Sequence, residues 1–168
     1  MNKFFLTICF LIVLQSSAQQ YMDTAKISEI INKHSDTLTG TLGNWQFIYK
    51  EVPMICITDA TNNRMRIIAP IREASNLNKE LLLDAMTANF HAVLDVKYAI
   101  SNGILWSAYI HPLKELTSEQ IESALSQVYF ATKNFGTTFS STELIFGNTN
   151  EKKNPVYQEN KKMNDRTF

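Results

Sequence analysis

An Asn-Gly pair at Asn102-Gly103 separates two apolar runs, at residues 93–100 and 104–111. Asn and Gly both accept the positive φ angles that a two-residue hairpin turn requires. The pair therefore predicts an antiparallel β-hairpin, which favours a fold built from strands that are adjacent in sequence.

Three earlier segments are rich in aromatic and β-branched residues and predict further strands. They cover residues 44–51, 54–58 and 64–71, with a turn-rich stretch at 59–63. Short strands separated by turn residues are typical of an antiparallel meander. Five strands are therefore expected in all.

Helical spacing of apolar residues occurs in three places. The first helix is expected at about 24–36, and the second at 77–90, where Leu82, Met86 and Phe90 recur every fourth residue. The third follows Thr117, which forms a capping box with Gln120. The expected order is α-β-β-β-α-β-β-α. It predicts an α+β fold with a mostly antiparallel five-stranded sheet and helices mainly on one side.

The first 18 residues have the features of a secretory signal peptide. Lys3 precedes an apolar stretch at residues 4–14, and small residues at Ser16 and Ala18 mark a cleavage site. Eleven helical residues reach about 16 Å, too short to span a bilayer. The protein is expected to be exported, to the periplasm or beyond, with no stable membrane span after cleavage. Residues 19–147 form the expected domain, and 148–168 a flexible polar tail.

Charge and cysteine content narrow the classes of partner. The chain carries 16 basic and 16 acidic residues, so it lacks the basic excess typical of nucleic-acid-binding proteins. Cleavage after Ala18 would leave Cys56 as the one cysteine, which excludes an internal disulfide.

Sequence motifs of common active sites are absent. The chain contains no G-x-S-x-G, G-x-x-x-x-G-K-[ST] or G-x-G-x-x-G motif. His34, His91 and His111 lack the spacing of a helical zinc site. We therefore expect a protein that is not an enzyme, with no catalytic residue, metal or cofactor.

Two strands are apolar on both faces. In residues 104–111, Trp106 and Ile110 alternate with Leu105 and Tyr109, and residues 54–57 have the same two-sided character. A sheet with one wet face should be polar at alternate positions. Either helices cover both faces of this sheet, or one face meets another chain.

The segment from Arg64 to about Val128 resembles the YbjN family, which is related in fold to type III secretion chaperones. The matching residues are 64–70 (RMRIIAP), 77–83 (LNKELLL), Asn89-Phe90, Gly103, Pro112-Leu113, Leu116-Thr117 and Gln120-Ile121. The resemblance implies a compact α+β domain that often dimerises, binds peptides or unfolded segments, and has no enzymatic activity. This chain differs from the type III secretion chaperones, which are cytoplasmic, because it carries an expected signal peptide.

Strand periodicity gives a candidate binding surface. If Met65, Ile67 and Ala69 face the helices, Arg64 and Arg66 face away. The family pattern turns Leu105, Ser107 and Tyr109 inward. The predicted partner-facing residues are Met54, Cys56, Arg64, Arg66, Trp106 and Ile110. The opposite interpretation places Trp106 in the core, with the two faces exchanged.

The sequence thus predicts an exported, chaperone-like or regulatory module that binds a peptide or an unfolded protein segment. Main-chain pairing at a sheet edge and apolar pockets would supply the binding. The alternative is a structural homodimeric assembly module without a peptide ligand.

Export has a direct test. We expect the exported protein to begin at Gln19, because Ser16 and Ala18 occupy the small-residue positions of the cleavage site. N-terminal sequencing of protein from the medium or periplasm measures this. Full-length protein retained in the cytoplasm would contradict it.

Overall fold

The computed structural model describes residues 21–143, so the expected signal peptide and tail lie outside the described residues. The described residues contain three α-helices, six strands and one short 3-10 helix. In chain order these are α2 (Thr24–His34), β1 (Thr37–Thr41), β2 (Asn44–Tyr49), β3 (Val52–Asp59), β4 (Arg64–Glu73), η1 (Ala74–Asn76), α3 (Lys79–His91), β5 (Lys97–Ser101), β6 (Ile104–His111) and α4 (Ser118–Lys133).

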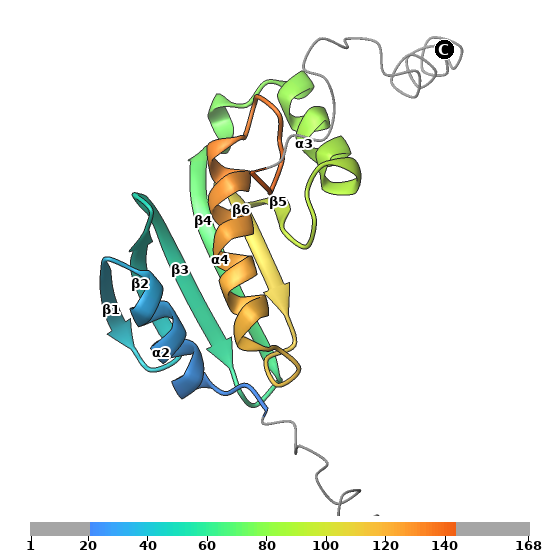
Figure 1. Ribbon diagram of the computed structural model, residues 1–168. Helices are drawn as coiled ribbons and strands as arrows, with labels where there is room; N and C mark the ends of the chain where they lie inside the picture. The colour runs from blue at the N-terminus through green and yellow to red at the C-terminus, as the bar shows by residue number, and fades with distance from the viewer. Residues whose placement is uncertain (1–20, 144–168) are drawn as a thin grey trace, which may run out of the picture.

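All six strands form one sheet in the order β1-β2-β3-β4-β6-β5, and every neighbouring pair is antiparallel (Figure 1). The α+β class and the antiparallel hairpins agree with the sequence analysis. Asn102 and Gly103 both have positive φ at the β5–β6 turn, as the Asn-Gly pair predicts.

The expected count of five strands is wrong, because β1 was not foreseen. Its sequence is Thr-Leu-Thr-Gly-Thr, and Leu38 is its one large apolar residue. The strand lies at the edge of the described sheet, where it pairs with β2 alone among residues 21–143, and its side chains are mostly exposed. An edge strand of this kind carries too little hydrophobic alternation to be recognised.

Strands β2 and β3 meet at a two-residue turn that lacks the usual turn residues. Lys50 and Glu51 both have positive φ, and Tyr49 pairs directly with Val52. The Lys50 Nζ lies 5.3 Å and 5.5 Å from the ring centroids of Tyr49 and Tyr129. This cation–π geometry accompanies a backbone that Lys and Glu rarely adopt.

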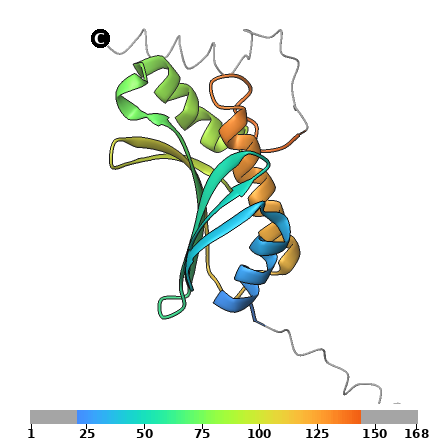
Figure 2. The same cartoon turned by 90° about the vertical axis from the view of Figure 1, so that its left-hand side faces the viewer.

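Helices α2 and α4 cover one face of the sheet, and no helix formed by residues 21–143 lies over the opposite face (Figure 2). The core therefore lies between these helices and the inner side chains of the strands. The inner strand residues include Trp45, Phe47, Met54, Cys56, Met65, Ile67, Ala69, Leu105 and Tyr109. Ile27 and Ile31 of α2 and the apolar stripe of α4 complete it.

Helix α3 lies at one end of the sheet beside β5 (Figure 1). Asn89 fixes it there, donating from Nδ2 to the Tyr98 carbonyl oxygen at 3.1 Å and accepting from the Tyr98 N–H at 2.7 Å. The buried residues of α3 are Ala85 and Ala88, whereas Met86 and Phe90 are exposed. The expected apolar stripe through Met86 and Phe90 therefore points away from the core.

The helix starts follow local capping rules. Thr117 and Gln120 form the predicted capping box, with the Thr117 N–H donating to Gln120 Oε1 at 2.8 Å. Asp23 and Asn78 accept from backbone N–H groups at the starts of α2 and α3.

Within residues 21–143, no helix combines the length and hydrophobicity needed to cross a bilayer.

Candidate functional site

The sheet surface opposite α2 and α4, here called the helix-free face, is largely apolar. The strand register assigns its members, because cross-strand partners share a face. Its apolar residues are Ile48, Pro53, Ile55, Ile57, Ile68, Pro70, Ala99, Ile104, Trp106, Ala108 and Ile110. Apart from Ala108, each of them is at least partly exposed, and Ile110 is 59% exposed. A contiguous apolar patch of this kind is typical of an interaction surface.

A groove of about 320 Å³ crosses part of this face. It extends over β1, β2 and β3 to Pro70 of β4. Pairing between β3 and β4 begins only at Ile55 and Ile68, so Pro53 and Pro70 lie beyond the paired region. Proline has no N–H to donate to a ladder, so both residues suit the place where the two strands stop pairing.

Four of the six predicted partner-facing residues lie on the helix-free face. Arg66 is directly opposite Ile110 on β6, and Trp106 is opposite Pro70. Arg64 and Arg66 are exposed, while Trp106 is partly exposed and its Nε1 donates to the Ser101 carbonyl oxygen at 3.2 Å. Leu105, Ser107 and Tyr109 are buried on the inner face, as expected. Partner binding by the four outer residues stays a prediction.

The placement of Met54 and Cys56 on that face is wrong. Met54 is 1% exposed and Cys56 is completely buried, and Cys56 pairs with inner-facing Ile67. Arg66 instead pairs with Ile57, so the odd-numbered residues of β3 share its face. Odd-numbered and even-numbered positions of β3 are both apolar, so the sequence alone could not show which set faces the helices. Burial raises the pKa of the Cys56 thiol to about 12, so the group stays protonated.

Sequence reasoning missed most of the apolar residues of β2, β3 and β4 on this face. Ile48, Ile55, Ile57 and Ile68 alternate with core residues, and the two-sided apolar pattern was the available signal. On β6 the resemblance to the YbjN family chose between the two faces, because its pattern turns Leu105, Ser107 and Tyr109 inward. The apolar pattern alone could not choose between the faces of β3.

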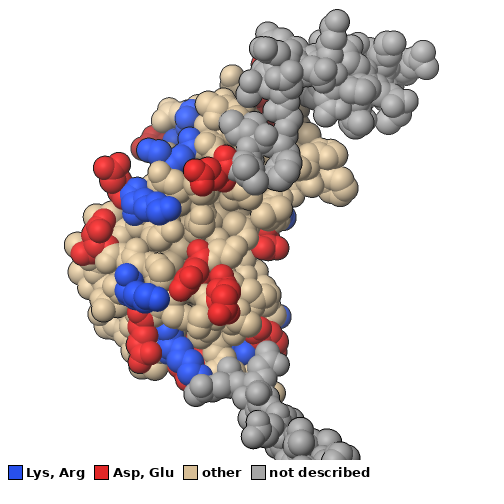
Figure 3. Space-filling model, viewed as in Figure 1, with Lys and Arg blue, Asp and Glu red and all other residues tan. Residues whose placement is uncertain are grey.

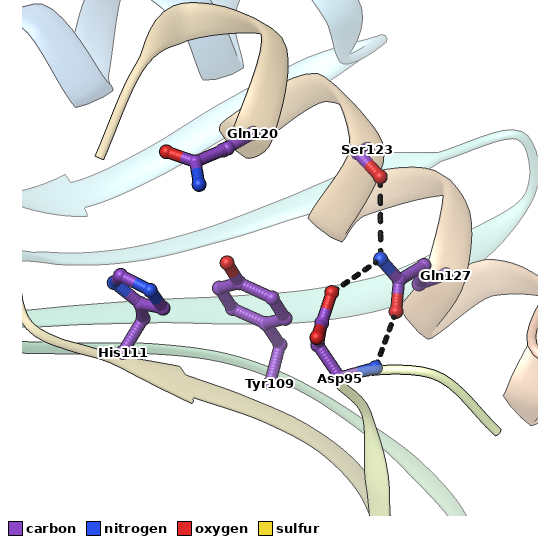
Figure 4. Close-up of a pocket in the computed structure, with 6 residues that line it drawn as sticks. All are labelled: Asp95, Tyr109, His111, Gln120, Ser123 and Gln127. Carbon is purple, nitrogen blue, oxygen red and sulfur yellow. Dashed lines mark hydrogen bonds between the residues drawn. The ribbon is translucent and has the colours of Figure 1, made fainter. Parts of the chain in front are cut away.

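A smaller polar pocket of about 90 Å³ lies between β6 and α4 (Figure 4). Gln127 donates to Asp95 Oδ2 at 3.0 Å and to Ser123 Oγ at 3.2 Å, and it accepts from the Asp95 N–H at 3.0 Å. These bonds hold the segment before β5 against α4. Gln127 is buried, and the bonds satisfy its amide.

The aromatic groups of this pocket are poorly arranged for acid–base chemistry. The Tyr109 hydroxyl points towards α4, and burial, with a smaller contribution from the Asp95 charge, raises the Tyr109 pKa (Figure 4). His111 stacks on Tyr109 and its Nδ1 is 2.8 Å from the Pro112 carbonyl oxygen, to which it donates. Ser123 Oγ accepts a hydrogen bond from the Gln127 side-chain amide, which is not a base. We therefore regard the helix-free face as the stronger candidate site.

On the side covered by α4, basic and acidic residues are interspersed (Figure 3). Over residues 21–143, no three His, Cys, Asp or Glu side chains gather in a way that could hold a metal ion.

Comparison with known proteins identifies the fold. No family model matches the chain, and no curated protein matches it, so the YbjN resemblance stays a prediction. The protein is similar in structure to a chain of the HopA1-SchA chaperone-effector complex, with a TM-score of 0.51 and 11% sequence identity. The match covers 65% of this chain and 88% of that chain. The protein is also similar to a chain of the ExsC-ExsE complex, with 15% identity, a TM-score of 0.50, and coverage of 67% and 95%. These likenesses support the chaperone-like fold expected from the sequence.

Burial of Cys56 predicts an unreactive thiol. The chain's other cysteine, Cys9, is first changed to Ser. Ellman's reagent at about pH 8 should then modify native protein at least about a hundredfold more slowly than protein in urea, because the native thiol is neutral and covered. Rapid labelling of native protein would contradict the inner placement of Cys56.

Two neighbouring positions on β6 distinguish the two faces of the sheet. Leu105→Ala should cost about 2–5 kcal/mol of unfolding free energy, because Leu105 is fully buried. Trp106→Ala should cost only about 1–2 kcal/mol, because part of the ring already faces solvent. Urea unfolding measures both. A loss at Trp106 as large as at Leu105 would show that Trp106 belongs to the core.

Proposed function

We propose that the protein is a chaperone-like module that binds an extended segment of a partner protein on the helix-free face. The observation that carries the proposal is the continuous apolar surface of that face, which runs from Ile48 through Ile55 and Ile68 to Ile110. A folded protein gains nothing from exposing such a surface to water. Covering it with a partner would remove that surface from solvent.

The groove suits an extended chain rather than a compact small molecule. Thr37, Thr39 and Gln46 lie along one side of it, and Pro53, Ile55 and Pro70 lie along the other. Thr37 and Thr39 belong to edge strand β1, which within residues 21–143 pairs with β2 alone. An extended segment could therefore place side chains in the groove while its main chain pairs with β1.

The same proposal takes the protein to be exported and not an enzyme. The apolar stretch and small residues at its N-terminus support export. The polar pocket supports a structural role for its side chains, because Gln127 joins Asp95 to α4. In the HopA1-SchA complex a fold of this type occurs together with an effector, which makes a protein partner the natural class to test.

A homodimeric assembly module is the second candidate, and one observation favours it. Helix α3 and the loop after it expose Leu83, Met86, Phe90 and Leu94, and Phe90 is 85% exposed. This apolar surface lies on a different element from the helix-free face, so self-association there would leave the helix-free face open. Sedimentation velocity on wild type and Phe90→Ser measures this contribution.

Peptide selection tests the proposed function. A random displayed peptide library is panned against the purified protein, and affinities of the recovered peptides are then measured for variants. Ile55→Gln should weaken binding at least about tenfold, because it removes an apolar contact in the groove. Leu83→Gln makes the same kind of change on α3 and should leave the affinity unchanged.

Ile48→Gln provides a second groove variant if Ile55→Gln lowers stability, since Ile48 is already exposed. Recovery of no binding peptide, or of peptides that bind both groove variants as well as wild type, would contradict binding at the helix-free face. Self-association of the wild type without any peptide binding would favour the homodimeric module.

A further inference from the structure

Among the cations of the helix-free face, Arg66 lies within the apolar part, whereas Lys97 is on edge strand β5, opposite Ala108. Arg66 is on β4, an interior strand of the sheet, and its cross-strand partners are Ile57 on β3 and Ile110 on β6. Ile68 follows two residues later on the same strand and the same face. Apolar side chains therefore surround the base of the Arg66 side chain on three sides.

Arg66 has no charged or hydrogen-bonding partner within residues 21–143. Along the β3–β4 ladder, the carboxylate nearest to Arg66 is that of Asp59, which is opposite Arg64 at the end of β3. Asn62 already engages Asp59, donating from its backbone N–H at 2.9 Å and from Nδ2 at 2.7 Å. The Arg64 Nη1 donates to the Asn63 carbonyl oxygen at 3.0 Å, so Arg66 differs from its neighbour in being free.

A partner that covers the isoleucines around Arg66 must also cover Arg66. The free guanidinium is hydrated, and burying it without a counter-ion would oppose binding. A carboxylate removes this penalty, because it accepts two parallel hydrogen bonds from a guanidinium. The face therefore selects for an acidic group at one position of an otherwise apolar segment.

We propose that the bound segment carries an Asp or Glu that pairs with Arg66, between apolar side chains that contact Ile57, Ile68 and Ile110. This inference rests on the proposed function and specifies the chemistry of the partner. It also argues against a second copy in a face-to-face arrangement. A two-fold interface centred on Arg66 would bring the two guanidinium groups together, and Asp59 is held at the periphery.

Charge reversal at Arg66 tests the inference. Peptides recovered by panning are synthesised with Glu, Gln or Lys at their acidic position, and their affinities are measured. Wild type should prefer the Glu peptide to the Gln peptide by at least about tenfold. Arg66→Glu should reverse the order in favour of Lys, and Arg66→Gln should abolish the preference.

Lys79→Glu is the matched control, because it makes the same charge change on α3, away from the face. It should keep the wild-type preference for Glu. Recovered peptides without an acidic residue, equal binding of the Glu and Gln peptides, or an unchanged preference in Arg66→Glu would overturn the inference. Sensitivity of those peptides to Ile55→Gln would leave the proposed function intact. Recovery of no peptide would contradict the proposed function and this inference with it.

Discussion

The sheet has apolar side chains on both faces, but α2 and α4 cover only one. Because side chains alternate along a strand, the inner residues of β3, β4 and β6 fix the outer ones by register. Burial of Cys56, Ile67 and Tyr109 therefore directs Ile57, Arg66 and Ile110 to the opposite face. The inner face stabilises the fold through its core. The outer face retains a surface that contributes little to stability alone.

Local irregularities then shape this outer surface. Pairing between β3 and β4 stops at Ile55 and Ile68, and the prolines beyond them leave a groove. Within the paired region, β4 brings Arg66 into the centre of the isoleucines. In the proposed function, the groove would supply apolar contact area, and the arginine would supply discrimination by charge. Neither depends on the polar pocket, whose hydrogen bonds hold the segment before β5 to α4.

Much of this architecture could be predicted where local signals were strong. Asn102-Gly103 defined the β5–β6 hairpin, and Thr117 with Gln120 defined the start of α4. Edge strand β1 escaped prediction because it has few apolar residues, and the turn at Lys50-Glu51 because its residues are unusual for it. The candidate site was predicted on β6 and β4 but not on β3. The alternation of side chains along β3 separates its residues into two faces. Only the pairing of β3 with β4 shows which of these two sets shares a face with Arg66.

Isoleucine side chains report separately on the two faces. Ile48, Ile55, Ile57, Ile68 and Ile110 lie on the helix-free face, whereas Ile27, Ile31, Ile67 and Ile121 are buried in the core. The most direct measurement is a methyl NMR titration of the isotope-labelled protein with a bound peptide. Binding to the helix-free face predicts large shifts of the first group and small shifts of the second. Shifts confined to α3, at Leu83 and Met86, would contradict it.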